Sequence, residues 1–240
     1  MPAMPSVSTK RPADASMAIE VLRAHSLATL AQQELERRII SGEIPAGSKL
    51  NEVEMATALG ISRGPVREAF SALAQAGLVR VEKNRGVFVR QVSVEEANEF
   101  YEVRVALEGL IGQLAARRIA IDEIEALRAV VRRMHLTQKS RKADEYFALN
   151  VEFHDLLARA ARNNALLAQY RGIVNQLDLY RRATIAHGTD HIPTSTAEHE
   201  AIIEAVAARD EQRAQALLGE HVLASRARLH AALGAPAPRP

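Results

Sequence analysis

The sequence predicts a mainly α-helical protein in two parts, a small N-terminal domain that closes with a β-hairpin and a larger all-helical bundle. Two β-like runs, LVRVE at 78–82 and GVFVR at 86–90, are joined by a tight KNRG turn. From Ser93 onward glycines become rarer and apolar residues recur with helical spacing. With 240 residues, 48% of them hydrophobic, the chain can bury a core.

Three helices are expected before the hairpin. Leucine and isoleucine residues recur at helical spacing over 27–39, and the turn-rich segment SGEIPAGSKL follows them. A shorter helix is expected over 51–59. Ser62 can cap a third helix, which stops at Gly77. Three helices followed by a hairpin describe a winged helix-turn-helix.

The rest of the chain is expected to form a helical bundle. Ser93 and Glu96 are spaced as a capping box, which sets the domain boundary just before them. We expect the bundle helices near 94–118, 122–138, 142–162, 164–186, 194–209 and 211–232. The predicted units are a disordered tail (1–24), a winged helix-turn-helix domain (25–91), a helical domain (92–233) and a second tail (234–240).

Composition narrows the class of protein. The absence of cysteine excludes disulfides, thiolate metal sites and cysteine nucleophiles. No apolar run approaches the roughly 18 residues that a membrane helix needs, and the first residues lack the apolar core of a secretory signal. We therefore expect a cytoplasmic protein with no membrane segment. Although the net charge is only +2, residues 62–90 hold six basic and two acidic side chains, a local basic footprint.

The stretch GISRGPVREAF forms the second helix of the predicted helix-turn-helix, the one that enters the major groove of DNA. Arg63 and Arg67 are four residues apart and project from one face of it. An arginine fork can bind the O6 and N7 acceptors of guanine together. Ser62, Gly64 and the helix N-terminus can approach phosphates. The alternative for any one of these residues is an ordinary solvated charged face.

The tip of the predicted hairpin is also basic. Lys83, Asn84 and Arg85 would reach the adjacent DNA backbone or minor groove. Because one recognition helix per chain reads too few base pairs alone, we expect a homodimer on a double-stranded operator with an inverted repeat. Such a protein would work at the bacterial nucleoid.

Polar residues interrupt the apolar stripe of one bundle helix, which runs through Ala143, Phe147, Asn150, His154, Leu157 and Ala161. A buried polar group without a partner costs about 1–3 kcal/mol, so Asn150 and His154 need one. His199 and His221 also lie on apolar faces of their own helices. Three inward histidines and an amide oxygen suit a divalent metal such as Zn²⁺. The alternative is a set of hydrogen-bonded core histidines.

The chain resembles a known family over both parts. Residues 27–90, with RRIISGEIPAGSKLNEVEMATALGISRGPVREAFSALAQAGLVRVEKNRGVFV, look like the winged helix-turn-helix of GntR-type bacterial regulators. The resemblance assigns Ser62, Arg63, Gly64 and Arg67 to the recognition helix. Residues 94–232, with EVRVALEG, LNVEFHDLL, AEHEAIIEAV and GEHVLASRARL, resemble the FCD effector domain of the FadR-like branch.

The same resemblance implies a ligand set. In metal-binding FCD domains an Asp or Asn, a His four residues later, and one His from each of the last two helices hold a divalent cation. Asn150, His154, His199 and His221 match these positions. Zn²⁺ is the first expectation, with Ni²⁺ or Mn²⁺ as alternatives. An asparagine in place of an aspartate removes a negative charge from the site, so metal affinity should fall and an anionic effector can supply the charge.

Two details of the bundle are left open by the sequence. Six helices rather than seven would indicate the VanR-like subgroup, unless Gly109 and Gly112 break the first helix. Arg104 can reach into the bundle and meet an anionic effector, but Glu108 is four residues on and an ordinary helix ion pair is the alternative.

Three functions fit these observations. The first is a transcription regulator whose operator affinity is tuned by a small organic acid bound at a metal. The second is a DNA-binding module whose helical domain only dimerises. The third, a zinc hydrolase, lacks an HExxH motif, because Ile203 stands where its second histidine would be. The expectation is therefore a regulator that is not an enzyme.

Overall fold

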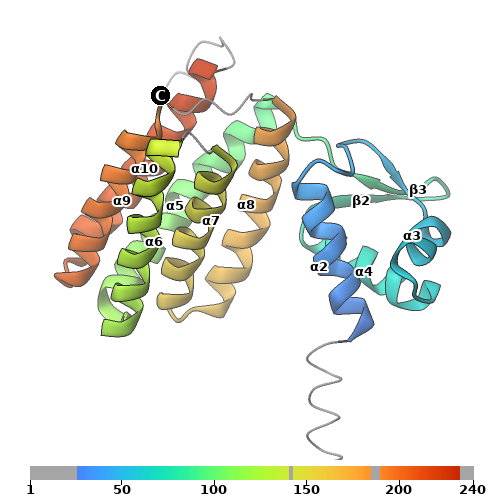
Figure 1. Cartoon of the computed structure of the whole chain (residues 1–240), viewed down its shortest axis with the longest axis horizontal. Coiled ribbons are helices and arrows are strands. Elements are labelled where there is room, and N and C mark those ends of the chain that lie inside the picture. Colours follow the sequence, from blue (N-terminus) through green and yellow to red (C-terminus); the bar gives the residue numbers. More distant parts are fainter. Residues whose placement is uncertain (1–25, 141–142, 185–189, 233–240) are drawn as a thin grey trace, which may run out of the picture.

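The protein was analysed as a computed structural model, which describes residues 26–140, 143–184 and 190–232. Two domains lie side by side, the N-terminal one on the right of Figure 1 and a helical bundle on the left. The predicted tails lie outside the described residues. No described helix is both long and apolar enough to cross a membrane.

The N-terminal domain is a winged helix-turn-helix. Its elements are α2 (Leu27–Ile40), β1 (Lys49–Leu50), α3 (Glu52–Leu59), α4 (Arg63–Gln75), β2 (Val79–Glu82) and β3 (Gly86–Val89). The strands form an antiparallel sheet in the order β1-β3-β2, in which Lys49 faces Phe88 and Val81 faces Val87. Strand β1 was not predicted, because two residues are too few to show alternation.

Helix ends in this domain follow their capping residues. The Asn51 side chain accepts the Val53 N–H at the start of α3, and Gly60 ends that helix with a φ of 65°. Ser62 occupies the N-cap position of α4 as expected, but its side chain makes no capping hydrogen bond. The Ser62 hydroxyl is therefore exposed beside the free N–H groups of the recognition helix.

The bundle contains the six expected helices, with bounds within a few residues of those predicted. They are α5 (Val94–Arg118), α6 (Ile121–Ser140), α7 (Ala143–Ala160), α8 (Asn164–Thr184), α9 (Ile192–Ala207) and α10 (Glu211–Ala232). The capping box at Ser93 and Glu96 is present with both of its hydrogen bonds. Apolar side chains of α5, α6, α7 and α9 meet in one buried core, centred on residues such as Phe153, Leu127 and Met134.

Gly109 and Gly112 do not break α5, which is continuous from Val94 to Arg118. The glycines instead let α10 approach closely. A Cβ atom on Gly112 would lie 2.6 Å from the Ala214 carbonyl oxygen and 2.8 Å from the Leu218 side chain. These glycines therefore serve helix packing and do not mark an end of the helix.

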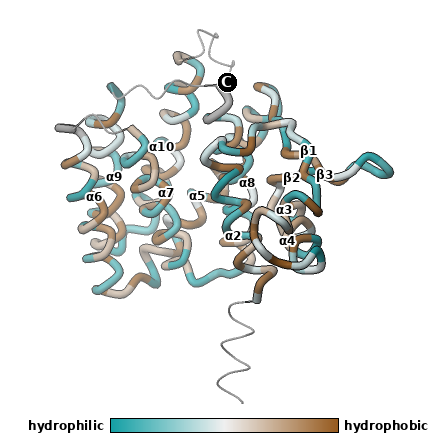
Figure 2. The backbone as a smooth tube through the Cα atoms, turned by 45° about the vertical axis from the view of Figure 1, so that its right-hand side comes forward, coloured by the Kyte–Doolittle hydropathy of each residue, from teal (hydrophilic) through white to brown (hydrophobic). Residues whose placement is uncertain are grey.

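Helix α8 is the bundle helix beside the N-terminal domain, where it contacts α2 (Figures 1 and 2). Leu179 of α8 is buried in the apolar core of the winged helix-turn-helix, together with residues such as Leu35 and Leu73. One turn away, Gln176 accepts a hydrogen bond from Arg90, which lies directly after β3. The two domains thus share core residues as well as the connecting chain.

Candidate DNA-binding surface and metal centre

Helix α4 presents the predicted recognition residues to solvent. Ser62, Arg63, Gly64 and Arg67 are all exposed, and the Arg63 and Arg67 side chains keep 61% and 66% of their accessible surface. Buried residues of α4 lie on its opposite face, so packing of the helix against α2 determines which face is free. A Cβ atom at Gly64 would meet nothing within 4 Å, which leaves its backbone open to a close partner.

Both recognition arginines are tied to one carboxylate of α3. Arg67 Nη2 lies 2.9 Å from Glu52 Oε2, and Arg63 Nη2 lies 3.4 Å from the same oxygen. The hydrogen bonds from Arg67 are the main cause of a lowered pKa of Glu52, which is therefore charged at neutral pH. Exposed pairs of this kind contribute little to stability, so the arginines can exchange Glu52 for another acceptor.

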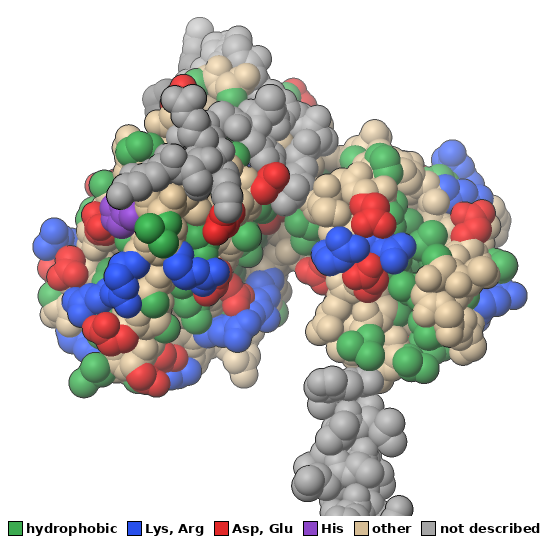
Figure 3. All heavy atoms as spheres, viewed as in Figure 1, with side chains coloured by type: hydrophobic (Ala, Val, Ile, Leu, Met, Phe, Trp, Pro, Cys, Tyr) green, Lys and Arg blue, Asp and Glu red, His purple; other side chains and the backbone are tan. Residues whose placement is uncertain are grey.

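The wing is formed by the turn between β2 and β3. Asn84 takes the left-handed conformation with a φ of 62°, and Lys83, Asn84 and Arg85 are all exposed at the tip. Arg85 pairs with Glu82 at 2.6 Å and lies over the Phe88 ring. The sequence predicted that these three polar side chains lie at the tip of the hairpin, and the structure agrees with this position. On the face seen in Figure 3, acidic and basic side chains are intermixed over both domains.

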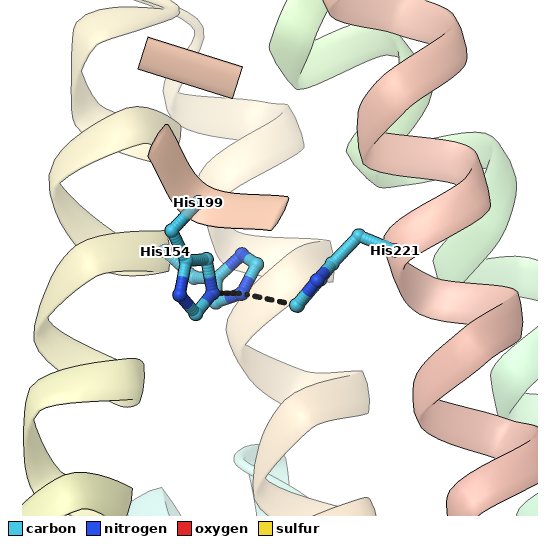
Figure 4. Close-up of side chains that lie close together, drawn as sticks. All are labelled: His154, His199 and His221. Atoms are coloured by element: carbon cyan, nitrogen blue, oxygen red, sulfur yellow. Dashed lines mark hydrogen bonds between the residues drawn. The ribbon is translucent and has the colours of Figure 1, made fainter. Parts of the chain in front are cut away.

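Three histidines from three helices meet inside the bundle (Figure 4). His154 of α7, His199 of α9 and His221 of α10 are each at most 4% exposed. His154 Nε2 lies 3.2 Å from His221 Nε2 and 3.4 Å from His199 Nε2. The three predicted histidines therefore converge through the same ring atom, which core histidines packed for burial alone have no reason to do.

Two carboxylates contact the far side of the histidine rings. Glu198 Oε2 accepts a hydrogen bond of 2.6 Å from His221 Nδ1. Glu108 Oε2 lies 2.9 Å from His154 Nδ1, although this contact is not aligned as a hydrogen bond. An Nδ1 that faces a carboxylate carries the proton of a neutral ring, because a lone pair there would face an anion. Both rings then direct an unprotonated Nε2 toward the centre of the cluster.

Arg104 and Glu108 form a buried ion pair on α5, 2.6 Å apart and no more than 3% exposed. Burial alone would raise the pKa of Glu108, but the charge of Arg104 outweighs it and holds that pKa well below its ordinary value. The ion pair considered for Arg104 is thus present, and its contact with an anionic effector stays a prediction. Arg104 is paired with Glu108, and it also lines the cavity beside the histidines.

Two of the three histidines, His199 and His221, are held in the neutral form that a metal requires. Burial lowers the pKa of His221 to about 4, although its hydrogen bond to Glu198 acts in the opposite direction. Burial also puts the pKa of His199 well below its ordinary value. Neutral imidazole is the form that coordinates metal ions, so no proton has to be displaced from these two rings at neutral pH.

Asn150 lies one turn before His154 on α7 and lines the same cavity, half-buried. A role for its amide oxygen as a fourth ligand stays a prediction. The sequence interpretation paired Glu108 only with Arg104 and did not consider Glu198. Glu198 precedes His199 by one residue and so falls on a different face of α9, which is why the helical stripe did not reveal its contact with His221.

Comparisons with known proteins agree with both domains. Residues 99–224 match the FCD domain family, and residues 27–89 match the family described as bacterial regulatory proteins, gntR family. A probable D-xylose utilization operon transcriptional repressor of Paenarthrobacter nicotinovorans is 33% identical over 188 residues, 78% of this chain and 81% of that protein. A gluconate operon transcriptional repressor of Bacillus licheniformis is 28% identical over 181 residues, 74% of each protein. The solved structure of E. coli McbR/YncC is alike in fold, with a TM-score of 0.74 at 19% identity, covering 86% of this chain and 98% of that one.

Proposed function

Because this chain belongs to the GntR family of bacterial transcription regulators and carries an FCD domain, we propose that it is a homodimeric operator-binding protein controlled by a small carboxylate at a metal-containing pocket. Regulators of this family bind DNA operators, and FCD domains bind small-molecule effectors. The chain is therefore a regulator and not an enzyme, which excludes the zinc hydrolase. We place its work in the bacterial cytoplasm, at the nucleoid.

The proposed DNA contacts are those of the exposed faces of α4 and the wing. Arg63 and Arg67 read guanine edges in the major groove, and Ser62 and Gly64 approach phosphates at the N-terminus of α4. Residues 83–85 hold the flanking backbone. A second copy supplies the other half of an inverted repeat, since one α4 helix covers only a few base pairs.

One observation carries the proposed metal site, namely that ring nitrogens of three histidines lie within 4.8 Å of one another while a carboxylate faces the Nδ1 atom of two of the rings. The closest separation, 3.2 Å between His154 and His221, would bring two lone pairs together without a hydrogen between them. A cation among the rings removes this repulsion. Tetrahedral Zn²⁺ with Zn–N bonds of about 2.0–2.1 Å requires N···N separations of about 3.3–3.4 Å. His154 Nε2 lies 3.2 Å from His221 Nε2 and 3.4 Å from His199 Nε2, so two of the three separations are close to this requirement.

The residues around the cluster fit an anionic effector. His154, His199 and His221 would hold a divalent ion, Zn²⁺ first and Ni²⁺ or Mn²⁺ as alternatives, with Asn150 as an uncharged fourth ligand. A bound divalent ion supplies positive charge for a carboxylate. Arg104 adds a guanidinium beside the same cavity. Glu108 and Glu198 keep the histidine rings oriented by contacts behind them.

Metal content tests the site directly. Protein purified without chelator or an affinity-column metal should contain about one divalent ion per chain, and its removal should lower the melting temperature. His221→Ala should lose the metal, whereas His135→Ala should keep it, because His135 is exposed and paired with Glu200 at 2.7 Å. The proposal would be refuted if the purified protein contained no metal and if added Zn²⁺, Ni²⁺ and Mn²⁺ all left its melting temperature unchanged.

Coupling between the pocket and DNA tests the regulatory part. An effector changes operator affinity only through its different affinities for the two arrangements of the dimer, and operator DNA must change effector affinity by the same factor. Calorimetry with and without operator measures that factor. Equal effector affinities in the two titrations would refute this coupling and favour the alternative, a helical domain that only dimerises.

A further inference from the structure

A cavity of about 220 Å³ opens beside the histidine cluster, between α5, α7, α8, α9 and α10. Its size suits a small molecule rather than a long acyl chain or a nucleotide. On α10 its lining residues recur at each turn, as His221, Ser225, Leu229 and Ala232. One turn of helix rises about 5.4 Å, so these residues mark successive levels from the histidine cluster outward.

The chemistry of the lining changes along this direction. At the inner end lie His221, Asn150 and Ser225, all polar. At the outer end lie Phe147 of α7 and Leu229 of α10, followed by an alanine on each helix, while another part of the wall carries the polar residues Tyr146, His191, Ser195 and Arg228. The cavity therefore offers polar partners to one end of a ligand and an apolar surface along one side of the rest of it.

Among the described residues three arginines line the cavity, and they differ in how closely a carboxylate neutralises them. Arg104 is neutralised by Glu108 at 2.6 Å, and Arg228 by Glu198 at 3.0 Å. Arg181 differs from both. Among the described residues its closest carboxylate oxygen is that of Asp178, 3.9 Å away.

The remaining contacts of Arg181 are with neutral groups. It donates hydrogen bonds to Ser225 Oγ at 2.6 Å and to the Tyr101 hydroxyl. Ser225 follows His221 by one turn of α10, so the least neutralised guanidinium of the cavity lies next to the histidine cluster. No second cationic group without a close carboxylate partner lines the outer end among the described residues.

From this gradient we propose that the effector is a small monocarboxylic acid with an aromatic or branched apolar body. The inference rests on the proposed metal-containing pocket and deepens it. The carboxylate is held at the inner end by the metal site and Arg181, and the body lies between Phe147 and Leu229. A polyhydroxylated acid fits less well, because the hydroxyl groups that face Phe147 and Leu229 would lose water against side chains that return no hydrogen bonds.

Calorimetry on the Zn²⁺-loaded full-length protein tests this with benzoate, gluconate and succinate as probes. Benzoate should bind at least about ten times more tightly than either of the others. Phe147→Ala should weaken benzoate about ten-fold while Phe147→Leu keeps most of the affinity, since leucine restores apolar surface. Leu167→Ala is the matched control, a half-buried apolar residue of α8 outside the cavity. It should leave benzoate affinity unchanged.

The outcomes distinguish a failure of this inference from a failure of the proposed function on which it rests. Tighter binding of gluconate or succinate than of benzoate, at normal metal content, would overturn the apolar-acid inference and leave the metal site standing. Unchanged benzoate affinity in Phe147→Ala would also overturn it. Zinc content, measured on the same samples, reports on the metal site alone. A wild-type protein that does not retain zinc would count against the proposed function.

Discussion

The two domains use the same pair of residue types in opposite ways. On α4, Arg67 meets Glu52 on a surface where the arginine side chain is 66% exposed. On α5, Arg104 meets Glu108 in an interior where neither side chain is more than 3% exposed. The first pair is screened by water and salt, whereas the second is almost wholly removed from solvent.

The difference indicates which charges are available for binding. An exposed arginine can leave its glutamate for a guanine or a phosphate at small cost. A buried arginine keeps its glutamate, so it can act on a bound molecule only as half of that ion pair. We therefore propose that the arginines of α4 carry DNA recognition and that the Arg104–Glu108 pair fixes the geometry around His154 beside the cavity.

The largest effect should come from breaking the buried pair. Glu108→Gln leaves Arg104 charged and without a counterion, which should cost about 3–5 kcal/mol of unfolding free energy. Chemical denaturation with metal present measures it. Glu125→Gln is the control, because Glu125 pairs with Arg128 at 2.9 Å on the surface. A loss no greater than that of the control would remove the contrast between the two pairs.

A second prediction compares the space around two glycines of the helical bundle, one on α5 and one on α8. Gly112→Ala puts a Cβ atom against the Ala214 carbonyl oxygen and should destabilise the bundle by about 1–3 kcal/mol through overpacking. Gly172→Ala on α8, where nothing lies within 4 Å, should instead stabilise it by up to about 1 kcal/mol, since alanine is the better helix former. Thermal melts of both variants give the comparison. A stabilised Gly112→Ala protein would contradict the close approach of α5 and α10.

Replacing an exposed arginine of α4 should weaken DNA binding without changing the stability of the fold. Arg67→Ala should lower specific operator affinity about 10- to 100-fold if it makes a bidentate guanine contact, with an unchanged melting temperature. Fluorescence anisotropy with operator and with random DNA measures the affinity. Arg213→Ala, on an exposed position of α10, should change neither. Operator binding at wild-type strength in Arg67→Ala would remove this helix as the reader.

The smallest effect is expected from Glu52→Gln, the surface counterpart of Glu108→Gln. Stability should be unchanged within error, because exposed pairs contribute little. Affinity for random DNA should rise by about two- to five-fold, since a negative charge beside two recognition arginines is removed. A salt titration of binding to random DNA detects this. A marked loss of stability would mean that the surface pair is not exchangeable.

Helical periodicity was enough to predict most of this fold. The bounds of all six bundle helices and both hairpin strands follow from local spacing and from capping residues such as Ser93. The misleading signal was Gly112, a glycine whose reason lies on another helix. Local sequence rules cannot distinguish a glycine that ends a helix from one that admits a neighbour, because the contact with Ala214 spans about a hundred residues of chain.

The candidate site could be predicted only in part, because some of its contacts also depend on how distant helices pack. His154, His199 and His221 were found because each interrupts an apolar stripe. The sequence did not indicate that Glu108 and Glu198 contact the histidine rings, since a carboxylate on a helix ordinarily faces solvent or pairs with a basic neighbour. Their contacts with histidine rings arise only when α5 packs against α7 and α9 packs against α10. The polarity gradient of the cavity depends on the same packing.

Leu179 has a consequence for protein engineers who exchange domains between regulators. It belongs to the bundle by sequence, yet it completes the apolar core of the winged helix-turn-helix. A hybrid cut at the linker near residue 91 would keep Leu35 and Leu73 but lose the side chain that covers them. Removing such a side chain typically costs a few kcal/mol. Hybrids that also transplant the α8 surface around Gln176 and Leu179 should be better folded than those joined at the linker alone.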